Sequence, residues 1–144
     1  MKNRDIGYLI KAINDKLKVR ADAELKDCDL TLSQSRVLAF LNSCGGQATQ
    51  KEIEDFMEVS HPTVVGIVTR MEQKGHVVSW IDPKDRRNKI VQITEQSAAI
   101  GRDMQRRVAA NEKRMLESLS EEDIETLTGW LTTIYDNLSR YEPE

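Results

Sequence analysis

Residues 60–94 read SHPTVVGIVTRMEQKGHVVSWIDPKDRRNKIVQIT, and the period of their apolar residues changes midway. In the first part, Ser60 is a typical helix N-cap, Pro62 suits a first helical turn, and Gly75 suits a helix end. Between them, apolar residues recur at helical spacing: Val64, Ile67, Val68 and Met71. This pattern predicts a short helix that buries one side and leaves the other free.

The second part of this stretch has the pattern of a β-hairpin. Val77, Val78, Trp80 and Ile81 form a β-branched and aromatic run, and residues 90–93 form another. Between the runs, residues 82–85 (DPKD) have the composition of a turn. We therefore expect a hairpin with a charged tip directly after the helix.

Upstream, a second short helix is expected. Residues 49–52 (TQKE) have the form of a capping box, which starts a helix running to about Met57 with Ile53 and Phe56 inward. About three residues separate this helix from the one that Ser60 caps. Two short helices so connected are typical of a helix-turn-helix.

Longer helices flank this central part. Apolar spacing predicts one over roughly residues 4–27, and a capping box at Thr31 opens another that ends at Gly45 and Gly46. Thr94 is expected to cap a long helix that carries Ile100, Met104, Val108, Met115 and Leu116, and Ser120 a last one. The expected fold is mainly α with a small β-hairpin: a winged helix-turn-helix over residues 31–94, with long helices in residues 1–30 and 95–144 for dimerisation.

Apolar stripes on the outer helices indicate an interface. The last helix carries a 3-4-3-4 seam, which suits helix–helix packing, and the first helix carries a similar stripe. Two alternatives stand: a homodimer, which we favour because the central part is too small to cover every stripe, and packing of the last helix on the chain's own first helix. The residues expected in the dimer interface are Ile6, Leu9, Ile13, Ile124, Leu127, Leu131, Ile134 and Leu138.

The charge distribution is uneven. The 144 residues carry a net charge of −3, but residues 60–94 alone carry +3, with six Lys or Arg against three Asp or Glu. A basic island in an acidic chain suggests contact with a polyanion, although ordinary unevenness of surface charge gives the same pattern.

Composition and motifs exclude several classes of protein. The sequence has two histidines, two cysteines (Cys28 and Cys44) and no HExxH, CxxC, GxGxxG or P-loop motif, so we expect no enzyme, metal or cofactor. No apolar run is long enough for a membrane helix and no signal peptide is expected, which favours a cytoplasmic protein.

Three segments resemble the MarR family of winged-helix transcription regulators. They are LTLSQSRVLAFL (30–41), similar to the family's second helix, SHPTVVGIVTRMEQKGHV (60–77), similar to its recognition helix, and DPKDRRNKIVQIT (82–94), similar to its wing. The resemblance implies a repressor that binds double-stranded DNA, released by a small anionic or phenolic effector or by thiol oxidation. For Cys28 and Cys44 we favour the simpler explanation that both are small packed or surface residues, because no neighbouring pattern predicts a lowered thiol pKa.

A recognition helix enters the major groove with the side that its own domain leaves uncovered. The outward residues expected to contact DNA are Ser60, His61, Pro62, Thr63, Val65, Gly66, Thr69 and Arg70. His61 is equally explained as a solvated residue at a helix start. Many family members have polar residues where Val65 and Gly66 stand, which implies a larger share for DNA shape and for the wing.

The wing carries a dense cluster of charged, mainly basic residues. Those expected to contact DNA are Lys84, Asp85, Arg86, Arg87 and Lys89. A narrow minor groove attracts an inserted guanidinium. By resemblance, Arg87 is the inserted residue and Asp85 orients the arginine pair. A solvated hairpin on a winged-helix module that binds other proteins, without specific DNA binding, is the alternative interpretation.

Overall fold

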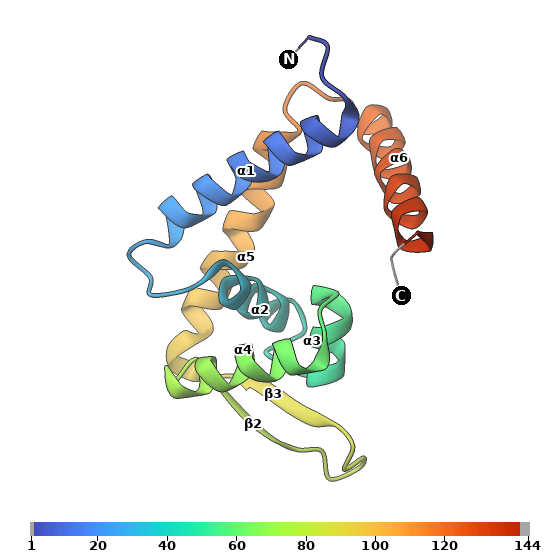
Figure 1. Ribbon diagram of the computed structural model, residues 1–144. Helices are drawn as coiled ribbons and strands as arrows, with labels where there is room; N and C mark the ends of the chain where they lie inside the picture. Colours follow the sequence, from blue (N-terminus) through green and yellow to red (C-terminus); the bar gives the residue numbers. More distant parts are fainter. Residues whose placement is uncertain (1, 142–144) are drawn as a thin grey trace. The chain divides into compact units, whose positions relative to one another are not determined.

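The computed structural model describes residues 2–141, which belong to two compact units that divide between Arg107 and Val108 (Figure 1). The first unit contains α1 (Ile6–Leu25), α2 (Leu32–Ser43), β1 (Gln47–Thr49), α3 (Gln50–Met57), α4 (His61–Gln73), β2 (Val77–Ile81), β3 (Lys89–Ile93) and the first part of α5 (Glu95–Met115). The second contains the end of α5 and α6 (Glu121–Arg140). The predicted fold class, mainly α with a small β-hairpin built as a winged helix-turn-helix, is confirmed.

The sheet has three antiparallel strands in the order β1-β3-β2. The predicted hairpin pairs β2 with β3 from Val77 opposite Ile93 to Ile81 opposite Lys89. The sequence analysis missed β1, which pairs Ala48 with Val91 on the other side of β3. A strand of three residues is too short to show the alternation that identifies longer strands.

The core of the first unit lies where α2, α4 and the sheet meet. The four predicted inward residues of α4 are buried, together with Leu38 and Leu41 of α2 and Val91 of β3. The expectation that Phe56 lies inward is wrong: it is 53% exposed, and its ring stacks on Phe40 with centroids 4.3 Å apart. Ile53, one turn earlier on the same helix, takes the buried position.

The predicted capping boxes at Thr31 and Ser120 both form. The one at Thr49 forms in part: its hydroxyl accepts the backbone N–H of Glu52 at 3.1 Å, but the Glu52 carboxylate accepts from that hydroxyl rather than from a backbone N–H. The expected cap at Thr94 is wrong. Its hydroxyl donates to the carbonyl oxygen of Gly75 at 2.7 Å, because the hairpin returns the chain to the end of α4.

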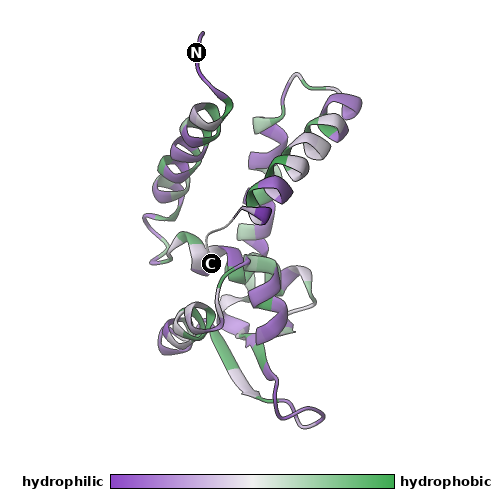
Figure 2. Ribbon diagram, turned by 45° about the vertical axis from the view of Figure 1, so that its right-hand side comes forward, coloured by the Kyte–Doolittle hydropathy of each residue, from purple (hydrophilic) through white to green (hydrophobic). Residues whose placement is uncertain are grey.

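Apolar side chains remain exposed on the outer helices. Hydrophobic and hydrophilic residues alternate along α1 (Figure 2), where Ile6 and Ile13 are exposed and Leu9 is half-buried. In α6, which the structure describes completely, no residue is buried. Within residues 2–141, no helix combines the length and the apolar character needed to cross a membrane.

Candidate nucleic-acid interface

The N-terminus of α4 is built around Ser60. Its hydroxyl accepts the backbone N–H of Thr63 at 3.4 Å and lies 2.8 Å from the Thr63 hydroxyl. Pro62 occupies the first turn, where its missing N–H leaves no acceptor unsatisfied. Ser60, His61, Pro62 and Thr63 are all exposed, so this end of the helix is open to a ligand.

Farther along α4, the outward surface is less polar. Val65 is 40% exposed, and its carbonyl accepts the hydroxyl of Thr69 at 2.7 Å. The Arg70 guanidinium folds back over Gly66, where an added Cβ would lie 3.4 Å from Nη1. Arg70 must therefore swing away before any ligand can approach the backbone of Gly66.

The wing tip is shaped by two aspartates. Asp82 accepts the backbone N–H of Lys84 at 2.9 Å, and Asp85 accepts that of Arg87 at 3.1 Å. Asp85 also accepts two bonds from the Arg87 guanidinium, at 3.1 Å from Nε and 3.3 Å from Nη2. Hydrogen bonding to the Arg87 side chain and backbone holds the pKa of the Asp85 carboxyl below its usual value.

The other basic residues of the wing differ in their partners. In the described part of the chain, neither Lys84 nor Arg86 has an ion pair or a side-chain hydrogen bond. Lys89 Nζ lies 3.9 Å from a carboxylate oxygen of Glu72, on α4. Asp85 is thus bonded to Arg87, and Arg86 is left free at the tip.

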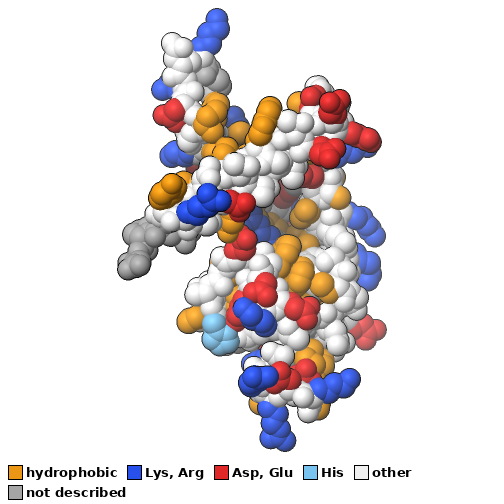
Figure 3. All heavy atoms as spheres, turned by 90° about the vertical axis from the view of Figure 1, so that its right-hand side faces the viewer, with side chains coloured by type: hydrophobic (Ala, Val, Ile, Leu, Met, Phe, Trp, Pro, Cys, Tyr) orange, Lys and Arg blue, Asp and Glu red, His pale blue; other side chains and the backbone are white. Residues whose placement is uncertain are grey.

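A cavity of about 330 Å³ is lined by residues of both α4 and the wing. It brings His61 and Val65 of α4 next to Arg87 and Lys89 of the wing; its lining also includes Gln50, Lys51, Glu54 and Asn88. Ser60, Thr63, Arg70, Lys84 and Arg86 lie outside this lining. Around the wing, at the lower end of the view in Figure 3, the outermost charged side chains are basic.

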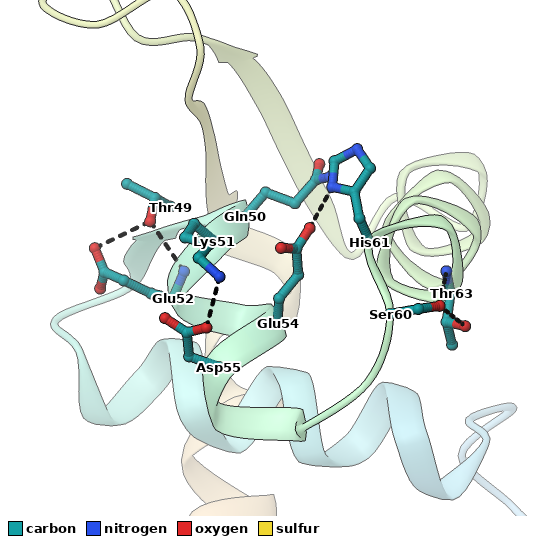
Figure 4. Close-up of polar contacts among 9 residues, drawn as sticks. All are labelled: Thr49, Gln50, Lys51, Glu52, Glu54, Asp55, Ser60, His61 and Thr63. Atoms are coloured by element: carbon teal, nitrogen blue, oxygen red, sulfur yellow. Dashed lines mark hydrogen bonds and ion pairs between the residues drawn. The ribbon is translucent and has the colours of Figure 1, made fainter. Parts of the chain in front are cut away.

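The sequence analysis missed the contribution of α3 to this surface. The Glu54 carboxylate contacts His61 Nδ1, and Gln50 Nε2 lies 3.5 Å from the same nitrogen (Figure 4). Gln50 and Glu54 are four residues apart and so share one face of α3. That spacing was visible in the sequence, but it does not indicate that this face lies against the start of α4.

The metal-ligating and thiol side chains of the described residues are arranged as follows. Between residues 2 and 141, no group of three His, Cys, Asp or Glu side chains is arranged to hold a metal ion. Cys28 is half-buried and packs against the core, whereas Cys44 is exposed at the end of α2, and both are free thiols.

Comparison with known proteins adds four findings. Residues 29–88 match the sequence model of the MarR family. YfiV of Bacillus subtilis, an uncharacterised HTH-type transcriptional regulator, is 32% identical over 113 residues, which are 74% of this chain and 70% of that protein. The crystal structure of Staphylococcus aureus MepR bound to DNA superposes with a TM-score of 0.83, at 25% identity, over 94% of this chain and 99% of that one. The organohalide-sensing regulator RdhR, solved with bound 2,4-dichlorophenol, shares the fold at 19% identity with a TM-score of 0.74, over 94% of this chain and 83% of that one.

Proposed function

We propose that this chain, which belongs to the MarR family of DNA-binding transcription regulators, acts in the cytoplasm as a homodimeric repressor on a palindromic operator. Proteins of this family are transcription factors and not enzymes, in agreement with the absence of catalytic motifs from the sequence. The observation that carries the proposal is the cavity flanked by the start of α4 on one side and by the basic wing on the other.

The two elements suit adjacent grooves of one duplex. In the proposal, α4 enters the major groove, with Ser60, His61 and Thr63 close to base edges or phosphates at its N-terminus. The wing follows the backbone to the minor groove, where Arg87 is inserted and the free side chains of Lys84 and Arg86 neutralise phosphates. The DNA complex of MepR, which shares this fold, supports the DNA-binding part of the proposal.

Dimerisation is proposed for residues 1–30 and 95–144. The stripes of α1 and α6 leave large apolar side chains in water, and burying them against a second copy would stabilise the pair. Two copies related by a twofold axis read two half-sites about 34–36 Å apart, one turn of DNA. Such a dimer bound at a promoter would block transcription, which is the basis for proposing repression.

Release by a small effector is the last part of the proposal. A second cavity, of about 270 Å³, lies in the first unit between the end of α1, the loop that follows it and Lys74 at the end of α4. Leu25 and Leu30 give it an apolar side, and Lys26 and Lys74 line it together with the carboxylates of Asp22 and Asp29. Because Asp29 Oδ1 lies 3.6 Å from Lys74 Nζ, a small aromatic anion would bind by replacing Asp29 as the partner of Lys74. A ligand bound there would contact the end of the recognition helix. Titration of the operator complex with benzoate and with 2,4-dichlorophenol tests this step. If neither compound displaces the protein from DNA, release by such an effector is contradicted.

The experiment that tests DNA binding measures affinity by fluorescence anisotropy against salt concentration. The chain should bind duplex DNA with log K falling at about 0.9 per phosphate contacted for each tenfold rise in salt. Replacing Arg86 and Arg87 together by alanine should weaken binding by about 1–3 kcal/mol and reduce that slope. Arg102 and Arg106 on α5, replaced in the same way, are the matched control and should have little effect.

Two outcomes would contradict the proposal. Affinity that does not depend on salt, or that survives the Arg86/Arg87 replacement unchanged, would favour the alternative of a protein-interaction module. The repressor role is tested separately, with a reporter gene placed behind a DNA fragment that the protein selects from its own genome. Expression that rises when the regulator is present would contradict repression.

A further inference from the structure

The contact between Glu54 and His61 determines which ring nitrogen of His61 carries a hydrogen. A carboxylate oxygen can only accept, so the Nδ1 that it contacts carries a hydrogen. The amide nitrogen of Gln50, 3.5 Å away, cannot donate to a nitrogen already protonated and therefore only packs beside it. The other ring nitrogen, Nε2, points away from α3 (Figure 4).

The two partners differ in their access to solvent. The side chain of Glu54 is 12% exposed, whereas that of His61 is 68% exposed. Glu54 therefore lies beneath the ring and His61 lies on the surface that faces the proposed DNA. A largely buried carboxylate holds the exposed ring from below, and the direction of Nε2 depends on this contact.

Three cations line the cavity beside the ring, and each has its own carboxylate. Lys51 Nζ is 2.9 Å from Asp55, Arg87 is bonded to Asp85, and Lys89 lies near Glu72. Because those three carboxylates are paired with other cations, Glu54 is the carboxylate that contacts His61. Its negative charge is also misplaced for a surface that binds a polyanion, unless it is matched by a positive charge on the ring.

We propose that Glu54 is a positioning residue that holds the His61 ring by its Nδ1–H with Nε2 directed at the DNA, and that this ring takes up a proton when the operator binds. This inference rests on the proposed function and adds to it. A protonated ring donates from Nε2 to a phosphate oxygen or to guanine N7 or O6. A neutral ring with its hydrogen on Nδ1 presents a lone pair at Nε2, which a phosphate oxygen repels.

The test is the pH dependence of DNA affinity, measured by anisotropy between pH 6 and pH 8 at constant ionic strength. For the wild-type chain, affinity should fall from pH 6 to pH 8, by at most about tenfold per pH unit for each bound copy, since one proton per ring is linked to binding. Both His61→Gln and Glu54→Gln should reduce the change to about twofold or less. Glu54→Gln should also bind at pH 8 at least as tightly as the wild type, because it removes a negative charge from the DNA-facing surface.

Asp55→Asn is the matched control. It removes one carboxylate from the same helix, one residue away, without touching the ring. Its affinity should change equally at every pH, so its pH profile should match that of the wild type. Any pH dependence that remains in His61→Gln belongs to groups other than this ring.

Several outcomes would overturn the inference. A flat wild-type profile with strong DNA binding would contradict it and leave the proposed function standing. Uniform weakening of Glu54→Gln at all pH values, with the pH profile unchanged, would mean that Glu54 only supports the fold. Absence of DNA binding at every pH would contradict both proposals.

Discussion

Helices α4 and α6 carry similar apolar stripes but bury them to different extents. Four side chains of α4 are buried against α2 and the sheet, whereas α6 buries none. Apolar spacing therefore identifies a face that is suited to burial and does not identify what covers it. In α4 the covering elements belong to the same compact unit, and in α6 we propose that a second copy of the chain supplies them.

The largest effect is expected from truncating one bulky side chain on each helix. Met71→Ala on α4 removes a fully buried side chain and should lower the free energy of unfolding by about 2–5 kcal/mol. Leu138→Ala on α6, where the side chain is 66% exposed, should cost less than about 0.5 kcal/mol in the monomer. Urea denaturation at low protein concentration measures both. Equal losses for the two variants would mean that α6 is already packed within a single chain.

The second prediction concerns the partner of α6. Leu131→Asp places a charge on the proposed seam and should raise the dimer dissociation constant at least about tenfold, or about 1.4 kcal/mol, because an unpaired charge is costly to bury. DNA affinity should fall with it. Thr133→Asp, on the opposite side of the same helix, is the control and should leave the dimer intact. Sedimentation velocity distinguishes the two, and an unchanged mass for Leu131→Asp would contradict the proposed interface.

Most elements could be predicted from the sequence because their signals are local. A cap such as Thr31, an apolar period such as that of α4 and a turn such as residues 82–85 act within a few residues of one another. The basic wing was found for the same reason, since its charges are contiguous in the chain. The burial of Ile53 rather than Phe56 could not be predicted, because both fit the helical period and tertiary packing chose between them.

The features that were missed all depend on contacts between elements. β1 exists through its pairing with β3, some forty residues away in the sequence. Thr94 bonds to Gly75 because the hairpin returns the chain to the end of α4. The same holds for Glu54, which reaches His61 only because the turn between α3 and α4 folds them together. No local pattern carries such information.

A smaller difference is expected at the two capping boxes. Thr31→Ala should lower the free energy of unfolding by about 1 kcal/mol, since α2 lies in the core of the first unit. Ser120→Ala should instead fray the start of α6, which has no buried residue to transmit the loss. Urea denaturation reports the first effect and amide hydrogen exchange of residues 121–125 the second. A global loss from Ser120→Ala would show that α6 unfolds together with the core.

The smallest effect is a pH dependence of stability that involves the first unit. His76 is buried, its Nδ1 lies 2.8 Å from Ser97 Oγ, and burial, assisted by the charge of Lys74, lowers the pKa of its ring. The unfolded chain therefore binds a proton at about the ordinary pKa of 6.5, whereas the folded chain resists it. Stability should be constant above that pH and should fall as the pH drops from 6.5 toward the lower folded value.

Urea midpoints at pH 7.5, 6.5 and 5.5 measure this loss, with His76→Gln as the variant. His76→Gln keeps a polar group of similar length, so it should be less stable than the wild type at pH 7.5 yet should lack the decline below pH 6.5. The lowered pKa values of the Asp15 and Asp85 carboxyls act only below their ordinary value of 3.8, outside this range. If His76→Gln declines as steeply as the wild type, the proton is taken up elsewhere. His61, exposed at the start of α4, is then the group to replace next, because it is the other histidine of the chain.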